Sequence, residues 1–65
     1  MPGHTVGEIV TTANGKPVEI ILKDGRVIKG RVESPEEDRS FFDLKVVGPF
    51  GVVQYLDVSG VESFK

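Results

Sequence analysis

The stretch that most constrains the fold is residues 16–32, KPVEIILKDGRVIKGRV, which predicts two strands joined by a tight turn. Apolar residues in its first half recur with the period of two that a strand with one buried face requires: Val18, Ile20 and Leu22. Asp24-Gly25 then predicts a type I′ hairpin turn, because this dipeptide tolerates positive φ at both central positions. The stretch therefore predicts a β-hairpin.

A glycine lies inside the second of these strands. Gly30 offers no side chain to pack and costs backbone entropy, so a strand keeps it where a bend or a close approach requires it. We expect Gly30 to bend the strand and Gly25 to take positive φ in the turn. Both are predicted to be structural glycines.

A short helix is predicted before the hairpin, within residues 5–14, after a loose N-terminus at residues 1–4. Thr5 and Glu8 have the Thr-x-x-Glu spacing of a capping box, and apolar residues follow the i, i+3, i+4, i+7 pattern of one helix face. Asn14-Gly15 would end the helix in a left-handed C-cap. The same dipeptide could instead turn a hairpin, so a strand at residues 5–14 is the alternative.

The five strands are predicted at about residues 18–23, 26–33, 41–47, 52–58 and 61–64. Short connections favour antiparallel neighbours, and the bend in the second strand favours a curved sheet that approaches a barrel. We predict one mostly β domain over residues 1–65: a short N-terminal helix followed by a five-stranded, strongly bent antiparallel small barrel, a pattern that SH3-like and OB barrels share.

The chain is short, and this limits how it can be stabilised. A domain of 65 residues buries only about 60% of its unfolded surface, which leaves marginal stability. Cysteine is absent and His4 is the only histidine, so neither a disulfide nor a zinc site is expected, and no cofactor is predicted. Oligomerisation is the remaining means of stabilisation.

Charge and motifs exclude several classes of function. The formal net charge is -2 and no basic run is present, which argues against a strong, sequence-independent grip on phosphates. No apolar run has membrane-spanning length and no signal pattern is present, so we expect a soluble, cytoplasmic protein without a membrane partner. No serine or cysteine nucleophile has a histidine partner, and no phosphate loop opens a helix, so an enzyme is not expected.

The chain resembles the Sm-like family (LSm and Hfq proteins) over residues 5–64. The positions that carry the resemblance in the family's first motif are Pro17-Val18, Leu22, Gly25, Gly30 and Val32. Phe42-Asp43-Leu44 takes the place of a Met-Asn-apolar sequence, and Val58-Ser59-Gly60 takes the place of apolar-Arg-Gly. The chain is thus similar to a divergent member of this family.

The resemblance implies a homo-oligomeric ring that binds single-stranded RNA or acts as an RNA chaperone. Phe42 would stack on a base, Asp43 would read it, and Ser59-Gly60 would close the pocket. An ionised Asp43 accepts hydrogen bonds but cannot donate them, unlike asparagine, and Ser59 lacks the arginine charge. In the family the fourth strand pairs with the fifth strand of the next subunit, which would place interface residues here at Val53, Tyr55, Val61 and Phe64.

Strand periodicity gives these residues other roles. Phe42 shares a face with Leu44 and Val46, which predicts a core residue, and Asp43 fits a solvated or ion-paired strand position. The acidic run at residues 33–38 predicts a solvated loop, an element that repels nucleic acid, or a docking site for a basic protein partner. The alternative function is a ring-forming or SH3-like protein-interaction module without nucleotide binding.

Overall fold

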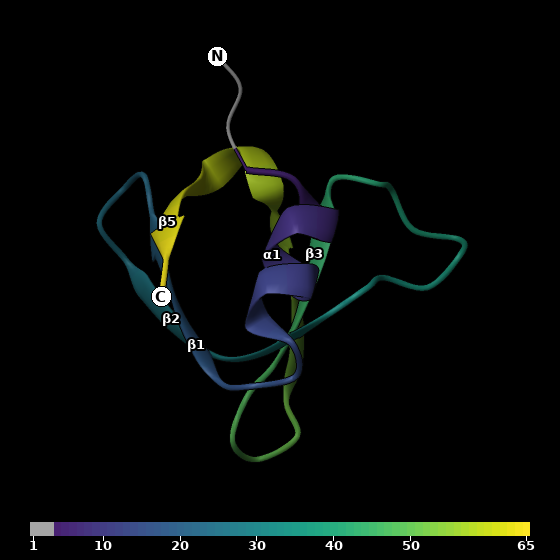
Figure 1. Cartoon of the computed structure of the whole chain (residues 1–65), viewed down its shortest axis with the longest axis horizontal. Coiled ribbons are helices and arrows are strands. Elements are labelled where there is room, and N and C mark those ends of the chain that lie inside the picture. The colour runs from purple at the N-terminus through teal and green to yellow at the C-terminus, as the bar shows by residue number, and fades with distance from the viewer. Residues whose placement is uncertain (1–3) are drawn as a thin grey trace.

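The computed structural model describes residues 4–65 and is mostly β, as predicted (Figure 1). A single α-helix, α1 (Val6–Ala13), precedes five strands in this part of the chain. The strands are β1 (Val18–Leu22), β2 (Val27–Glu33), β3 (Asp43–Val47), β4 (Val53–Asp57) and β5 (Val61–Phe64), and the 3-10 turn η1 (Val58–Gly60) joins the last two. No helix within residues 4–65 has both the length and the apolar character needed to cross a lipid bilayer.

The strands form one antiparallel sheet in the order β4-β3-β2-β1-β5, which leaves β4 and β5 as its two edges. Strand β2 belongs to both halves of the sheet. Its first part pairs with β1 as far as Gly30, which lies opposite Val18. Its second part pairs with β3 from Arg31, which lies opposite Val47. The sheet therefore bends strongly at this change of partner without closing into a complete barrel (Figure 1).

The bend brings the backbone of β3 against Gly30. A Cβ atom built on Gly30 would lie 2.6 Å from the carbonyl oxygen of Val47 and 3.0 Å from Cγ1 of Val46. A contact of this length with a backbone atom leaves no room for any side chain. Gly30 therefore meets both expectations for a strand glycine, since it lies at the bend and at a close approach.

Local sequence signals set both ends of α1. The Thr5 hydroxyl accepts a hydrogen bond from the Glu8 backbone N–H at 3.1 Å, and the Glu8 carboxylate accepts one from the Thr5 N–H at 3.4 Å. Asn14 ends the helix in the left-handed conformation at φ 51° and ψ 43°. The predicted helix is confirmed, and the alternative strand at residues 5–14 is excluded.

The hairpin between β1 and β2 is present, but its predicted type I′ turn is wrong. The N–H of Gly25 donates to the Leu22 carbonyl and the N–H of Leu22 donates to the Arg26 carbonyl, both at 2.9 Å, which encloses a three-residue loop. Gly25 has the expected positive φ, 94°, but Asp24 does not. This is the three-residue hairpin in which a left-handed glycine follows a type I turn. Asp24 instead accepts hydrogen bonds from the backbone N–H and Nε of Arg26.

The core lies between α1 and the concave side of the bent sheet. Its fully enclosed side chains are Ile9, Ile20, Leu44 and Val46. The other buried members are Val6, Ala13, Val18, Leu22, Val32, Val58 and Val61. Phe42 is not among them, so its predicted place in the core is wrong.

We predict that Gly30→Val destabilises the fold, because its side chain would overlap the Val47 carbonyl. Overpacking of this kind costs about 1–3 kcal/mol, which denaturant unfolding followed by circular dichroism can measure. Gly7→Ala is the matched control, since a Cβ at Gly7 meets nothing within 4 Å and a helical alanine gains about 0.5–1 kcal/mol over glycine. Equal stability of Gly30→Val and the parent chain would contradict the close approach.

Candidate functional site

The structure brings together the two segments that the sequence singles out for ligand binding. The Val58 N–H donates to the Phe42 carbonyl at 2.8 Å, and Asp43 lies opposite Asp57 where β3 pairs with β4. Phe42 and Asp43 therefore lie beside the turn that contains Ser59 and Gly60. We call these four residues the two-loop site.

Phe42 is available for contact because β3 begins one residue after it. The Ser40 hydroxyl accepts a hydrogen bond from the Phe42 N–H at 3.1 Å, and the Ser40 carbonyl accepts one from the Asp43 N–H at 3.2 Å. This turn breaks the alternation that leads to Leu44, so the Phe42 side chain is 64% exposed. A strand pattern alone could not reveal that the strand starts at Asp43.

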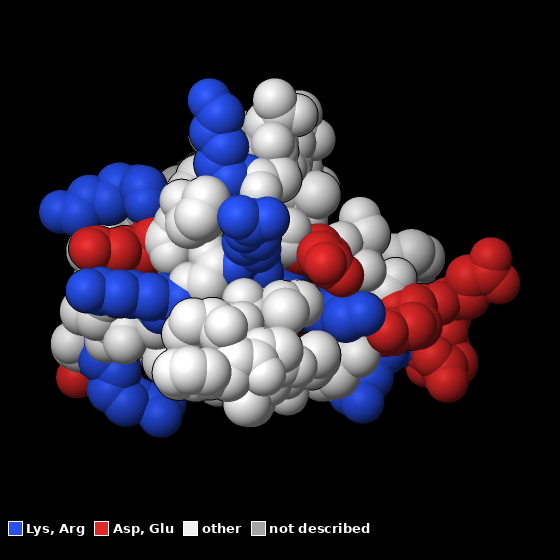
Figure 2. Space-filling view, turned by 90° about the horizontal axis from the view of Figure 1, so that it is seen from below, with Lys and Arg blue, Asp and Glu red and all other residues white. Residues whose placement is uncertain are grey.

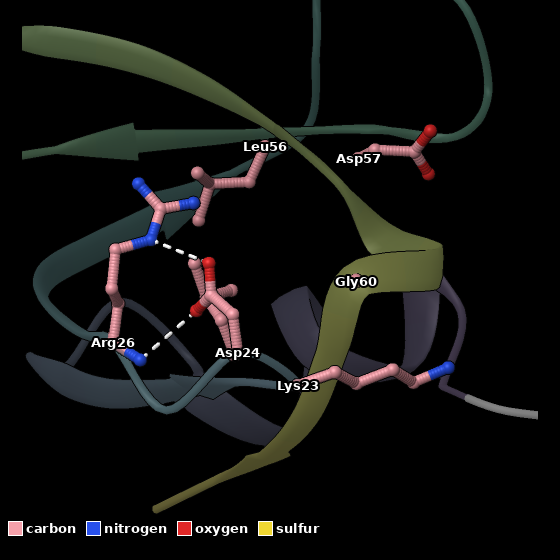
Figure 3. A pocket seen from close by; sticks show the side chains of 7 residues that line it. Lys23, Asp24, Arg26, Leu56, Asp57 and Gly60 are labelled. Carbon is pink, nitrogen blue, oxygen red and sulfur yellow. Dashed lines mark hydrogen bonds and ion pairs between the residues drawn. The ribbon is translucent and has the colours of Figure 1, made fainter.

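A shallow cavity of about 300 Å³ adjoins the two-loop site at Gly60 (Figure 3). It lies between the β1–β2 turn and the end of β4, and two of its lining residues are joined by a hydrogen bond from the Lys23 N–H to the Gly60 carbonyl at 2.9 Å. Its lining consists of Leu22, Lys23, Asp24, Arg26, Leu56, Asp57 and Gly60. Figure 3 shows the Asp24 carboxylate turned toward Arg26.

Carboxylates dominate the electrostatics of the two-loop site. Asp43 and Asp57 are directly opposed across β3 and β4, an arrangement that disfavours two like charges. The Ser59 N–H and hydroxyl both donate to Oδ1 of Asp57, at 2.9 and 2.8 Å, and these bonds lower the pKa of Asp57. The Asp43 carboxylate lies 3.9 Å from the Arg39 guanidinium. The site is therefore anionic, and the Ser59 hydroxyl is engaged by Asp57.

The acidic loop at residues 34–42 is fastened to the sheet by a group of side chains that we call the latch. The two Glu36 carboxylate oxygens accept from Nζ of Lys45 at 2.8 Å and from the hydroxyl of Tyr55 at 2.7 Å. The Arg39 guanidinium lies 3.6 Å from the centre of the Tyr55 ring. These bonds lower the pKa of Glu36 to about 2, with the Lys45 hydrogen bond as the largest cause.

The sequence does not predict the latch: Glu36 is expected to face solvent within the acidic run at residues 33–38, and Arg39 has no assigned role. A usable signal existed in the strand pairing. Lys45 and Tyr55 are cross-strand partners, so both side chains leave the same face of the sheet. The Lys45 ammonium and the Tyr55 hydroxyl can therefore both donate hydrogen bonds to one carboxylate of the preceding loop, which is Glu36.

The four predicted interface residues do not form one exposed patch. Val53 is exposed on β4, whereas Tyr55 is held by the latch and Phe64 is half-buried against the core. Val61 is only 3% exposed and belongs to the core of its own chain. His4, to which the sequence assigns no role, packs edge-on against Phe64 with ring centres 5.2 Å apart.

Comparison with known proteins identifies no relative of this chain. No family model, no curated protein and no solved structure matches it. Within residues 4–65, no three His, Asp or Glu side chains are arranged to hold a metal ion. Functional arguments therefore depend on the sheet edges, the two-loop site and the surface charges.

We predict that the latch opens only in strong acid. The pKa of Glu36 is lowered from 4.5 to about 2. The contribution of the ionised Glu36 carboxylate to the stability of the folded chain is therefore complete above pH 4.5 and is lost as the pH falls toward 2. Carbon-detected NMR titration of the Glu36 carboxyl group should give a midpoint near pH 2.

Glu36→Gln should release the loop at neutral pH, seen as faster amide exchange over residues 36–41. Glu37→Gln is the control, since Glu37 is exposed and makes no ion pair within residues 4–65. Equal exchange in both variants would contradict the latch.

Proposed function

We propose that this chain is the subunit of an Sm-like homo-oligomeric ring in which β4 of one copy pairs with β5 of the next. The observation that carries the proposal is the sheet order, which leaves β4 and β5 as the two open edges of a bent sheet. An open edge presents unpaired N–H and C=O groups that favour pairing with another strand. A head-to-tail contact between two different edges closes a ring when its rotation fits.

The register indicates which backbone groups are free for such pairing. Hydrogen bonds from Gly48 to Val52 and from Val58 to Phe42 flank the two ends of the β3–β4 pairing, and bonded pairs alternate along an antiparallel ladder. By this alternation, the N–H groups of Val53 and Tyr55 point away from β3. On the other edge, Lys65 bonds to Glu19, so the N–H of neighbouring Phe64 points away from β1.

Assembly would also compensate for the small core. Within residues 4–65, eleven apolar side chains are buried, and none of them is aromatic. Exposed apolar side chains remain at β4 and the hairpin before it, among them Val52 and Val53. Covering these in a neighbour's sheet adds apolar burial that the 65-residue chain cannot supply alone.

Single-stranded RNA is the ligand that we propose for the two-loop site. Phe42 offers an exposed aromatic face on which a base can stack, and it lies beside Ser59 and Gly60. In a ring, copies of this site would lie around a common axis. A protein-interaction ring without RNA is the second candidate, which the opposed carboxylates of Asp43 and Asp57 favour because they repel phosphates.

We predict that the purified chain has several times the mass of a monomer by light scattering, and that Val53→Pro returns it to monomer. Proline at position 53 removes an N–H that faces the free edge while sparing the bonds to β3. Circular dichroism should remain that of a folded chain. Gln54→Pro is the contrasting variant, since it removes an N–H directed toward β3 and should unfold the edge. A parent chain that is monomeric at micromolar concentration would refute the ring.

We also predict that Phe42→Ala weakens binding of oligouridine. Loss of one stacked base costs about 1–3 kcal/mol, equivalent to roughly five- to 150-fold in affinity. Fluorescence anisotropy with oligouridine and oligoadenosine, repeated over a range of salt, measures it. Phe50→Ala is the control, because Phe50 is also an exposed aromatic residue but lies on the β3–β4 hairpin. An intact ring that binds neither oligonucleotide at low salt would favour the protein-interaction candidate.

A further inference from the structure

A groove lies where β2 leaves β1 and joins β3, and we call it the split groove. It measures about 620 Å³ and its walls come from the start of β1, the middle of β2 and the end of β3. Its lining consists of Pro17, Lys29, Gly30, Arg31, Val47, Gly48 and Pro49. Its lining is mainly apolar.

The rim of the split groove is cationic. Arg31 is exposed and makes no ion pair within residues 4–65, and the same is true of Lys16, which precedes Pro17. Lys29 has only a 3.8 Å contact with Glu19, and both side chains are largely solvated. An apolar floor with unpaired cations at its edge suits a ligand that combines an apolar side chain with carboxylates.

The chain presents such a combination at the other end of β3. Phe41 is 89% exposed, and Glu37 and Asp38 lie just before it in the same loop, exposed and without ion pairs in the described residues. The latch holds this loop in place through Glu36, so Phe41 is presented from a fixed support. We call residues 37–41 the presenting loop.

Within one molecule the presenting loop cannot reach the split groove. The loop lies beside Asp43 and the groove beside Val47, at opposite ends of β3, which are about 13 Å apart along the strand. Figure 2 shows one group of acidic side chains projecting at the right, while the opposite side carries mainly cationic side chains with some acidic ones among them. The complementary partner of each surface is therefore on a second molecule.

We propose that the split groove receives the presenting loop of a second copy of this chain. Phe41 would enter between Pro17, Val47 and Pro49 and stack against the Arg31 guanidinium. Glu37 and Asp38 would lie against Lys29 and Lys16. This contact uses neither the β4 nor the β5 edge, so it is additional to the ring contact and independent of it.

The expected contact is weak. One aromatic side chain buries about 150–250 Å², far less than the roughly 1,200–2,000 Å² of a stable interface. Part of the attraction comes from exposed charges. Salt weakens this part, because the screening length falls from about 10 Å at 0.1 M to about 3 Å at 1 M. Docking should therefore appear at high protein concentration and low salt, and copies in a ring should strengthen it through multiple contacts.

Phe41→Trp tests the proposal, because the chain has no tryptophan and the indole then reports on this position alone. Its emission should shift to the blue and resist acrylamide quenching as the concentration rises from micromolar to near-millimolar, and high salt should reverse both changes. Adding Arg31→Glu should raise the midpoint concentration several-fold, because it replaces the stacked guanidinium with a carboxylate that repels Glu37 and Asp38. Arg31→Gln, which avoids a new charge at the bend, should raise it less.

Lys23→Glu is the matched control, since Lys23 is an exposed cation without an ion pair within residues 4–65 and lies outside the split groove. A Phe41→Trp chain that also carries Glu37→Lys and Asp38→Lys should recover the shift when mixed with a chain that carries Lys16→Glu and Lys29→Glu. Val53→Pro should keep the shift but move it to a higher protein concentration, which separates docking from ring formation. The proposal is overturned by an emission that does not depend on concentration, by an equal effect of Lys23→Glu, or by a mixture that recovers nothing.

Discussion

The close approach of Gly30 to the Val47 carbonyl is the constraint on which the rest of the structure depends. With 2.6 Å between that oxygen and the position of a Cβ, only glycine lets β2 pair with β1 on one side and β3 on the other. That shared strand bends the sheet around α1 and the core. It also leaves β4 and β5 apart as open edges, and it opens the split groove on the outside of the bend.

The latch governs how charge is distributed around this scaffold. Glu36 accepts hydrogen bonds from Lys45 and Tyr55, and these bonds hold the acidic loop against the strands β3 and β4. The remaining carboxylates of the loop then stay at one end of the molecule, while the cations of β1 and β2 remain at the other (Figure 2). Glu37 and Asp38 at one end, and Arg31 and Lys16 at the other, make no ion pair within residues 4–65, which favours contacts between these unlike ends of two molecules.

What the sequence predicts correctly depends on local interactions. The capping box of Thr5 and Glu8 lies within one helical turn, and the alternation in β1 reports its own buried face, so the helix and the strands could be predicted. The core position predicted for Phe42 is wrong because a turn through Ser40, and not the strand pattern, sets where β3 begins. The Glu36 latch joins residues up to 19 positions apart, and only the pairing of β3 with β4 brings its partners together.

The same distribution of charge decides how the proposed ring could meet RNA. In a ring each copy would bring Asp43 and Asp57 toward the shared axis, so the repulsion of phosphates grows with every subunit. Stacking on Phe42 would have to outweigh that repulsion, because Ser59 supplies no cation and its hydroxyl serves Asp57. Lys23 is the nearest unpaired cation among the described residues that line the adjoining cavity. Binding at this site should therefore depend on the base more than on the backbone, with a shallow salt dependence compared with proteins that grip phosphates.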